Sequence, residues 1–266
     1  MDHGSGGLSA GEFTMTSTMT STAHRLFVMW APPRSLSTAF VRVMAARGDF
    51  TILHEPLCDL AACGHFVHRR AGAEPRRLDT APALFEHVER LLGDAPVFVK
   101  DTCEYDYRDM LDGTNYLRDA THIFMLREPA SVINSHYHIN PDMRCEDVGY
   151  EHLARVYDLV RLQARARPLF IDAEKLVADP AGTVSRFCES AGLKHLPESL
   201  QWEGGHLEIW ERTKRWHLDA ANSNRIAPIE RQYAVRVDNH EQLRGFYQAN
   251  RPFYDYLRQQ AGSAQT

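Results

Sequence analysis

The sequence lacks the features that mark secreted, membrane-spanning and DNA-binding proteins. It has only five cysteines, an odd number without a Cys-x-x-Cys pair, so we expect no disulfide framework and predict a cytoplasmic protein. Its longest apolar runs, such as residues 26–31, are far too short to cross a bilayer. With 30 Lys and Arg against 35 Asp and Glu, it also lacks the basic excess that nucleic-acid binding usually requires.

The composition is otherwise that of a globular chain with a sizeable core. Hydrophobic residues make up 44% of the 266 residues, which is enough for one large domain. Residues 1–23 are rich in Gly, Ser, Thr and Met and hold no apolar segment like that of a signal peptide, so we expect a disordered N-terminal extension there. We predict a single domain over residues 24–266, in which residues 196–240 form a cap or lid.

Short apolar runs alternate with longer amphipathic stretches along this domain. The apolar runs predict strands at residues 26–30, 50–53, 97–99, 122–126 and 169–172. The longer stretches predict helices at residues 35–46, from 129 onward, 146–166, 181–191 and 241–260, the last interrupted by Pro252. Residues 69–80 are polar and predict a mobile loop. Strands separated by helices indicate an α/β fold, with a parallel sheet flanked by helices.

The turn after the first strand has the composition of a phosphate site. N–H groups of a first helical turn and the helix dipole both favour an anion, and Arg34 adds a guanidinium there. The Walker A pattern is not met, because Arg34 replaces its lysine and the flanking glycines are missing. An ordinary strand–helix turn, in which a serine only caps the helix, is the alternative. The predicted ligands of the phosphate are Pro33, Arg34, Ser35, Leu36, Ser37 and Thr38.

A second motif lies further along the chain. Arg127 follows the strand at 122–126, and Ser135 comes eight residues later in the next helix. The two motifs together resemble the sulfotransferases that use 3′-phosphoadenosine 5′-phosphosulfate (PAPS), most closely the bacterial small-molecule branch with an Arg-containing phosphosulfate loop. Residues 172–180 resemble the segment in which these enzymes end a strand before their next helix, so the resemblance extends from about residue 26 to 193.

The resemblance implies a P-loop-like core with a helical C-terminal cap, PAPS as co-substrate and 3′-phosphoadenosine 5′-phosphate (PAP) as product. It also implies that residues 30–38 hold the 5′-phosphosulfate and that Arg127 and Ser135 hold the 3′-phosphate. The sequence departs from the better-known cytosolic branch, where a Lys-Thr-His run supplies a histidine base. The corresponding residues here are 100–103, Lys-Asp-Thr-Cys, and no C-terminal Arg-Lys-Gly phosphate clamp is identified, although Lys214, Arg215 and Arg225 are candidate substitutes.

Sulfuryl transfer needs cations around the departing phosphate oxygen and a base for the acceptor. Lys100 and Arg34 are the predicted cations, and no metal is expected. Glu55 is the predicted base, because it follows the second strand and so lies at the sheet edge where ligands bind. A loop-holding ion pair is its alternative role, and the other candidate bases are His54, Asp101 and His136. Aromatic residues that either line an acceptor pocket or only pack are Tyr105, Tyr107, Trp210 and Trp216.

Other functions remain open at this point. A P-loop nucleotide kinase or NTPase would use Mg²⁺, for which Asp172 is the candidate ligand. A nucleotide-binding module without turnover, or an enzyme that uses sulfation to activate a leaving group for elimination or cyclisation, fits the same motifs. Zinc is a weaker alternative, because the spacing of Cys58, Cys63, His65 and His68 matches no common finger pattern. We predict a small-molecule acceptor, and neither a nucleic-acid nor a membrane partner.

Overall fold

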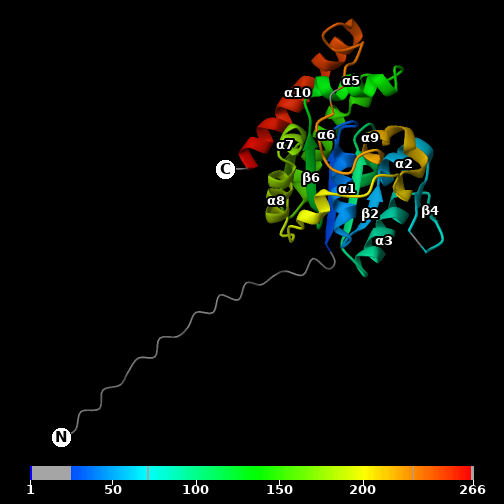
Figure 1. Cartoon of the computed structure of the whole chain (residues 1–266). Helices are drawn as coiled ribbons and strands as arrows, with labels where there is room; N and C mark the ends of the chain where they lie inside the picture. Colours follow the sequence, from blue (N-terminus) through cyan, green and yellow to red (C-terminus); the bar gives the residue numbers. More distant parts are fainter. Residues whose placement is uncertain (2–24, 71, 230, 265–266) are drawn as a thin grey trace.

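A five-stranded parallel sheet forms the centre of the molecule, as predicted (Figure 1). The computed structural model describes residues 25–264 except 71 and 230, together with Met1, so the extension predicted for residues 1–23 lies outside the described residues apart from Met1. The strand order is β2-β5-β1-β6-β7. The bounds are β1 (Leu26–Ala31), β2 (Thr51–His54), β5 (Val97–Thr102), β6 (Thr121–Leu126) and β7 (Leu169–Asp172).

Helices cover both faces of this sheet, because alternate side chains of each buried strand point to opposite faces. From β1, Phe27 and Met29 pack with α1 (Ser37–Arg47) and α8 (Pro180–Ser190). Val28 and Trp30 belong to the core on the other face, with α3 (Ala81–Leu92), α6 (Tyr150–Gln163) and α10 (Glu241–Ala264). The strands thus lie in the middle of a three-layer arrangement.

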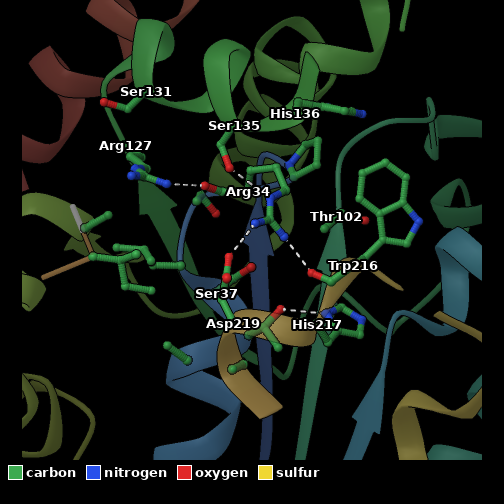
Figure 2. A pocket seen from close by; sticks show the side chains of 18 of the residues that line it. Arg34, Ser37, Thr102, Arg127, Ser131, Ser135, His136, Trp216, His217 and Asp219 are labelled. Carbon is green, nitrogen blue, oxygen red and sulfur yellow. Dashed lines mark hydrogen bonds and ion pairs between the residues drawn. The ribbon is translucent and has the colours of Figure 1, made fainter. Parts of the chain in front are cut away.

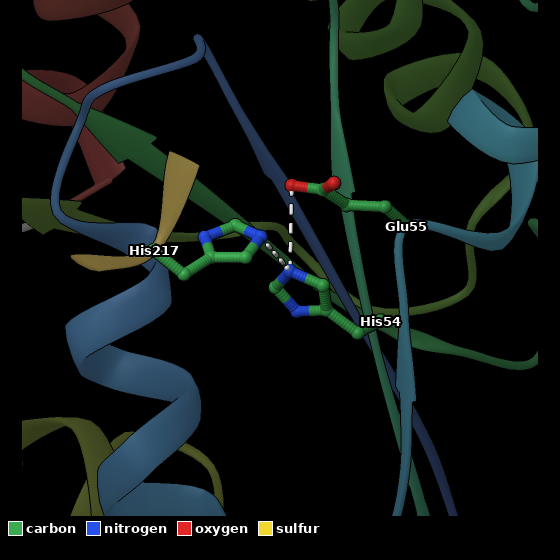
Figure 3. A group of neighbouring side chains, drawn as sticks. All are labelled: His54, Glu55 and His217. Carbon is green, nitrogen blue, oxygen red and sulfur yellow. Dashed lines mark hydrogen bonds and ion pairs between the residues drawn. The ribbon is translucent and has the colours of Figure 1, made fainter. Parts of the chain in front are cut away.

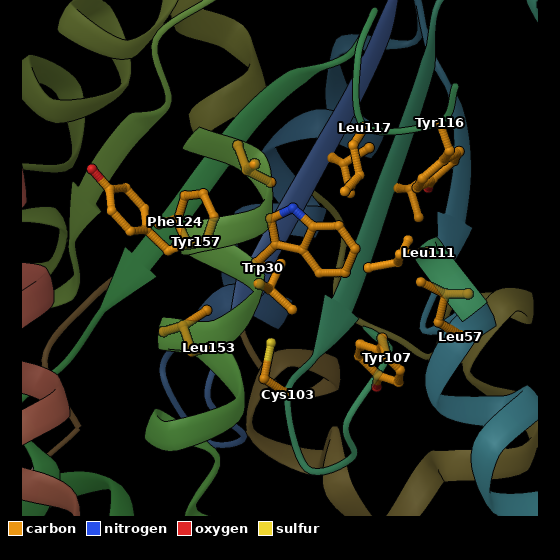
Figure 4. Packing of buried hydrophobic residues seen from close by; sticks show 14 of the residues in the cluster. Trp30, Leu57, Cys103, Tyr107, Leu111, Tyr116, Leu117, Phe124, Leu153 and Tyr157 are labelled. Atoms are coloured by element: carbon orange, nitrogen blue, oxygen red, sulfur yellow. The ribbon is translucent and has the colours of Figure 1, made fainter. Parts of the chain in front are cut away.

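Trp30 lies in the middle of the core on the face covered by α3, α6 and α10 (Figure 4). Its indole Nε1 donates a hydrogen bond to Nδ1 of His122 at 3.0 Å, and Nε2 of His122 donates to the carbonyl of Leu117 at 2.7 Å. Burial lowers the pKa of His122 to about 4, so the imidazole is neutral near pH 7 and every polar atom of the pair has a partner.

Three local expectations are corrected. Part of the loop predicted at 69–80 forms strand β4 (Arg76–Leu78), which pairs antiparallel with β3 (Phe66–His68). The helix predicted at 146–166 is divided at Gly149, whose φ is +87° and where a Cβ would lie 2.6 Å from the carbonyl oxygen of Cys103. Helix α10 continues through Pro252, because its contacts with α5 (Pro129–Ile139) and α6 outweigh the lost hydrogen bond.

The remaining elements are short, and several lie in the segment predicted as a cap. Among the described residues, no helix combines the length and the apolar character needed to cross a bilayer. The short elements are α2 (Pro56–Cys63), α4 (Arg108–Leu111), α7 (Ala173–Ala178), α9 (Leu218–Ala221) and the 3₁₀ helices η1 (Glu146–Val148), η2 (Pro197–Leu200) and η3 (Glu208–Trp216).

Candidate active site

A cleft of about 800 Å³ lies at the carboxyl edge of the sheet (Figure 2). That volume is typical of small-molecule sites. The turn after β1, the ends of β2, β5 and β6, and helix α5 form its walls, and residues between 212 and 233 line it as well. The cleft brings together all ten predicted site residues, Pro33, Arg34, Ser35, Leu36, Ser37, Thr38, Glu55, Lys100, Arg127 and Ser135.

The backbone is strained at this edge. Arg34, Leu36 and Glu55 have φ values of 61°, 70° and 56°, and they are the non-glycine residues with positive φ in the described part of the chain. All three line the cleft. Such left-handed backbone is costly for residues with a Cβ and is concentrated at functional sites, where the surrounding fold holds it.

Arg34 reaches across the cleft and connects its walls. The Nε atom donates to Oγ of Ser135 at 3.1 Å, and Nη2 lies 3.0 Å from a carboxylate oxygen of Asp219. Nη1 donates to the carbonyl of Trp216. Burial lowers the pKa of Arg34, which the Asp219 carboxylate partly offsets. The guanidinium is therefore held by two neutral oxygens and one carboxylate.

Arg127 lies beside this turn at the end of β6. Its Nη1 donates to the carbonyl oxygen of Arg34 at 2.6 Å, so its guanidinium faces the same cleft. Ser135 is buried one helix further on, in α5. The two sequence motifs, about a hundred residues apart in the chain, thus meet at one site.

A buried ion pair lies deeper in the cleft. The Lys100 ammonium donates to Oε1 of Glu55, and the Lys100 side chain is 1% exposed. Burial raises the pKa of Glu55, but the charge and hydrogen bond of Lys100, together with His54 and His217, outweigh it and hold that pKa well below its usual range. Glu55 is therefore ionised and bound to the ammonium of Lys100 on β5.

Two imidazoles adjoin this pair (Figure 3). The Nε2 atoms of His54 and His217 lie 3.2 Å apart, and Nε2 of His54 lies 3.5 Å from the Glu55 carboxylate. Among the described residues, these three form the group whose donor atoms are close enough to hold a metal ion. Lys100 already neutralises the one carboxylate in the group, which disfavours a second cation there.

Comparison with known proteins settles the family. The model of the sulfotransferase domain matches residues 25–261, almost the whole described part of the chain. The chain belongs to the sulfotransferase family. The match includes the C-terminal third, beyond the region in which the sequence motifs were identified.

The chain is similar to a curated plant protein and to solved sulfotransferase domains. It is 26% identical over 192 residues to "Branched-chain-amino-acid aminotransferase-like protein 2" of Arabidopsis thaliana, covering 67% of this chain and 32% of that protein, so it spans about a third of the relative's length. Its fold resembles the sulfotransferase domain from the curacin biosynthetic pathway, with a TM-score of 0.52 at 14% identity, covering 85% of this chain and 96% of that one. The sulfotransferase domain of the Synechococcus PCC 7002 olefin synthase gives 0.53 at 18% identity, covering 85% and 94%.

The four residues considered as candidate bases take different positions. Glu55 and His136 line the cleft, whereas His54 and Asp101 do not. Oδ1 of Asp101 accepts hydrogen bonds from the backbone N–H groups of Leu57 and Cys58 and so caps helix α2, a structural role. Burial lowers the pKa of His136 to about 4.

Several cleft residues were missed or left open by the sequence motifs. Glu104 and Asp219 line the cleft, and neither belongs to a recognisable motif. Of the four aromatic candidates, Tyr105 and Trp216 line it, while Tyr107 and Trp210 are buried in the packing. Of the candidate C-terminal cations, Arg215 and Arg225 line it, joined by Arg231, whereas Lys214 pairs with Glu211.

The four residues weighed as zinc ligands do not converge. Cys63 is exposed, whereas Sγ of Cys58 is hydrogen-bonded to Glu104. His68 contacts His87 through ring nitrogens 2.8 Å apart. These contacts are those of ordinary packed and surface side chains.

Proposed function

We propose that this sulfotransferase moves a sulfuryl group from PAPS to a hydroxyl or amine of a small molecule. The observation that carries the proposal is the meeting of Arg34, Arg127 and Ser135 in one cleft, where two anion sites can bind the two ends of a bisphosphorylated adenosine. The chain has 30 Lys and Arg against 35 Asp and Glu. This lack of a basic excess favours a small acceptor over an anionic polymer.

The turn at residues 33–38 suits the 5′-phosphosulfate. Ser35 Oγ is buried and has no hydrogen-bond partner among the described residues, and a phosphate oxygen would supply one. The N-terminus of α1, which has eleven residues, lies next to it and favours an anion. Arg34 would exchange the Asp219 carboxylate for the donor phosphate, so donor binding would also release this contact with the cap segment.

The ion pair of Lys100 and Glu55 suits the chemical step. In the transfer, the S–O bond to the donor phosphate breaks, the bond from sulfur to the acceptor oxygen forms, and the acceptor proton moves to Glu55. As Glu55 becomes neutral, negative charge grows on the departing phosphate. The Lys100 ammonium can then pair with this phosphate instead of with Glu55. The ion pair with Lys100 thus keeps Glu55 ionised before the reaction and weakens as Glu55 takes up the proton.

A nucleotide kinase is disfavoured by the position of its candidate Mg²⁺ ligand. Asp172 does not line the cleft. Its Oδ1 accepts from the N–H of Lys175, capping α7, and its Oδ2 accepts from Arg258. The carboxylate is committed to holding helices together.

Transfer assays in chelator separate the two activities. We expect radiolabelled sulfate to pass from PAPS to at least one member of a panel of phenols, alcohols and amines, with the same rate in excess EDTA as without it. ATP with Mg²⁺ should give no phosphoryl transfer to the same panel. Phosphoryl transfer that EDTA abolishes, without sulfuryl transfer, would overturn the proposal.

A further inference from the structure

Glu104 places a carboxylate in the cleft wall that the proposed reaction does not use. It follows β5 by two residues, at the same sheet edge as Lys100, and lines the cleft with Thr102 and Tyr105. Its Oε2 accepts hydrogen bonds from Oγ1 of Thr102 at 3.1 Å and from Sγ of Cys58 at 3.5 Å. Both donors are neutral.

Of the other carboxylates of the cleft wall, Glu174 is exposed to solvent, whereas three have cationic partners. Glu55 is paired with Lys100, Asp219 with Arg34, and Asp147 with Arg144 at 3.2 Å. Among the described residues, no ion pair involves Glu104, although it is half-buried. An ionised carboxylate in such a place is costly without a counter-charge.

The surroundings of Glu104 disfavour its ionised form. Burial, and next the neighbouring Glu55 carboxylate, raise the pKa of Glu104 from 4.5 to about 7. The titratable groups that interact with it include Glu55, Cys58, Cys103, Tyr105, Tyr107 and Lys100. Lys100 is the cation in this group, and it is already paired. A ligand that brings a positive charge would therefore gain most at this position.

We propose that the acceptor carries a cationic group, an ammonium or guanidinium, that pairs with Glu104 while its reacting hydroxyl lies at Glu55. Cys58, three residues after Glu55 and hydrogen-bonded to Glu104, places the two carboxylates on adjoining parts of one wall. The inference rests on the proposed function, because it assigns the second half of the same acceptor site. Glu55 would serve the reaction and Glu104 the selection of the acceptor.

Two nearly isosteric phenols test this assignment. Calorimetric titrations of 4-(aminomethyl)phenol and 4-ethylphenol into the PAP-saturated protein at pH 8 compare an ammonium with a methyl group. We expect the amine to bind at least about tenfold more tightly to the wild type, and the preference to fall below about twofold in Glu104→Gln. In Glu89→Gln, which loses the same charge on the exposed side of α3, the preference should remain.

Equal binding of the two phenols, no binding of either, or a preference that persists in Glu104→Gln would overturn the inference. PAP binding, measured first in each protein, separates this from the proposed function. If PAP does not bind the wild type, the proposed function fails and the inference falls with it. If PAP binds and the amine is not preferred, only the inference fails.

Thermal denaturation checks that Glu104→Gln remains folded and reports the charge directly. Because folding raises the pKa of Glu104, its ionisation costs stability as the pH rises from about 4.5 to 7. We expect the melting temperature of Glu104→Gln to equal or exceed that of the wild type at pH 8, with less gain at pH 5. A variant that melts lower at both pH values would show that the carboxylate is needed for the fold instead.

Discussion

Replacing Arg127 by alanine is expected to weaken PAP binding at least about 100-fold, or about 3 kcal/mol. The guanidinium lies half-buried in the cleft and would pair with the 3′-phosphate, where a charge-assisted contact is strong and its loss leaves the phosphate without a counter-charge. The hydrogen bond from Arg127 to the carbonyl of Arg34 would be lost as well, which would loosen the turn at residues 33–38. Isothermal titration of PAP measures the effect.

Two further variants serve as controls for Arg127→Ala. Arg127→Lys keeps the charge without the two-pronged geometry, and we expect an intermediate loss of affinity. Arg90→Ala removes an exposed arginine from α3, away from the cleft, and should bind PAP as the wild type does. Wild-type affinity in Arg127→Ala would remove this residue from the donor site.

Glu55→Gln is expected to slow sulfuryl transfer at least about 100-fold while PAP binding changes less than about threefold. Glutamine keeps the shape of the side chain but cannot accept the acceptor proton. The single-turnover rate at saturating PAPS isolates the chemical step, and calorimetry gives the PAP affinity separately.

The same change also removes the counter-charge of buried Lys100, which costs about 3–5 kcal/mol of stability where a buried pair is broken. Transfer is therefore measured below the melting temperature of the variant, and retained PAP binding shows that the cleft is intact. A transfer rate near that of the wild type would mean that another cleft residue, His136 or Glu104, takes the proton.

The sequence predicted the sheet and the residues that meet at its carboxyl edge, and the physical reason is local. Each strand is a short apolar run, and the residues that follow β1 and β6 are fixed by the strand ends on which they lie. Arg34, Arg127 and Glu55 could thus be placed at one edge before any contact was known. The predicted identity of the family is confirmed, whereas the individual roles of these residues remain predictions.

The rest of the cleft could not be predicted in the same way. The contact between Arg34 and Asp219 joins residues 185 positions apart, and it depends on how the cap segment returns to the sheet. Glu104 stands out because it is half-buried and has no ion-pair partner among the described residues, and the sequence alone does not show which charged residues form ion pairs. The division of the helix at Gly149 likewise follows from the approach of Cys103, a contact between distant segments.

A direct comparison of two nucleotides tests the central claim that the cleft has separate sites for the two phosphates of a bisphosphorylated adenosine. PAP and ADP carry the same base and the same number of phosphates, but only PAP has one on the 3′ position. We predict that calorimetric titration at fixed salt gives an affinity for PAP at least about 100-fold above that for ADP. Equal affinities, or tighter binding of ADP, would contradict the account.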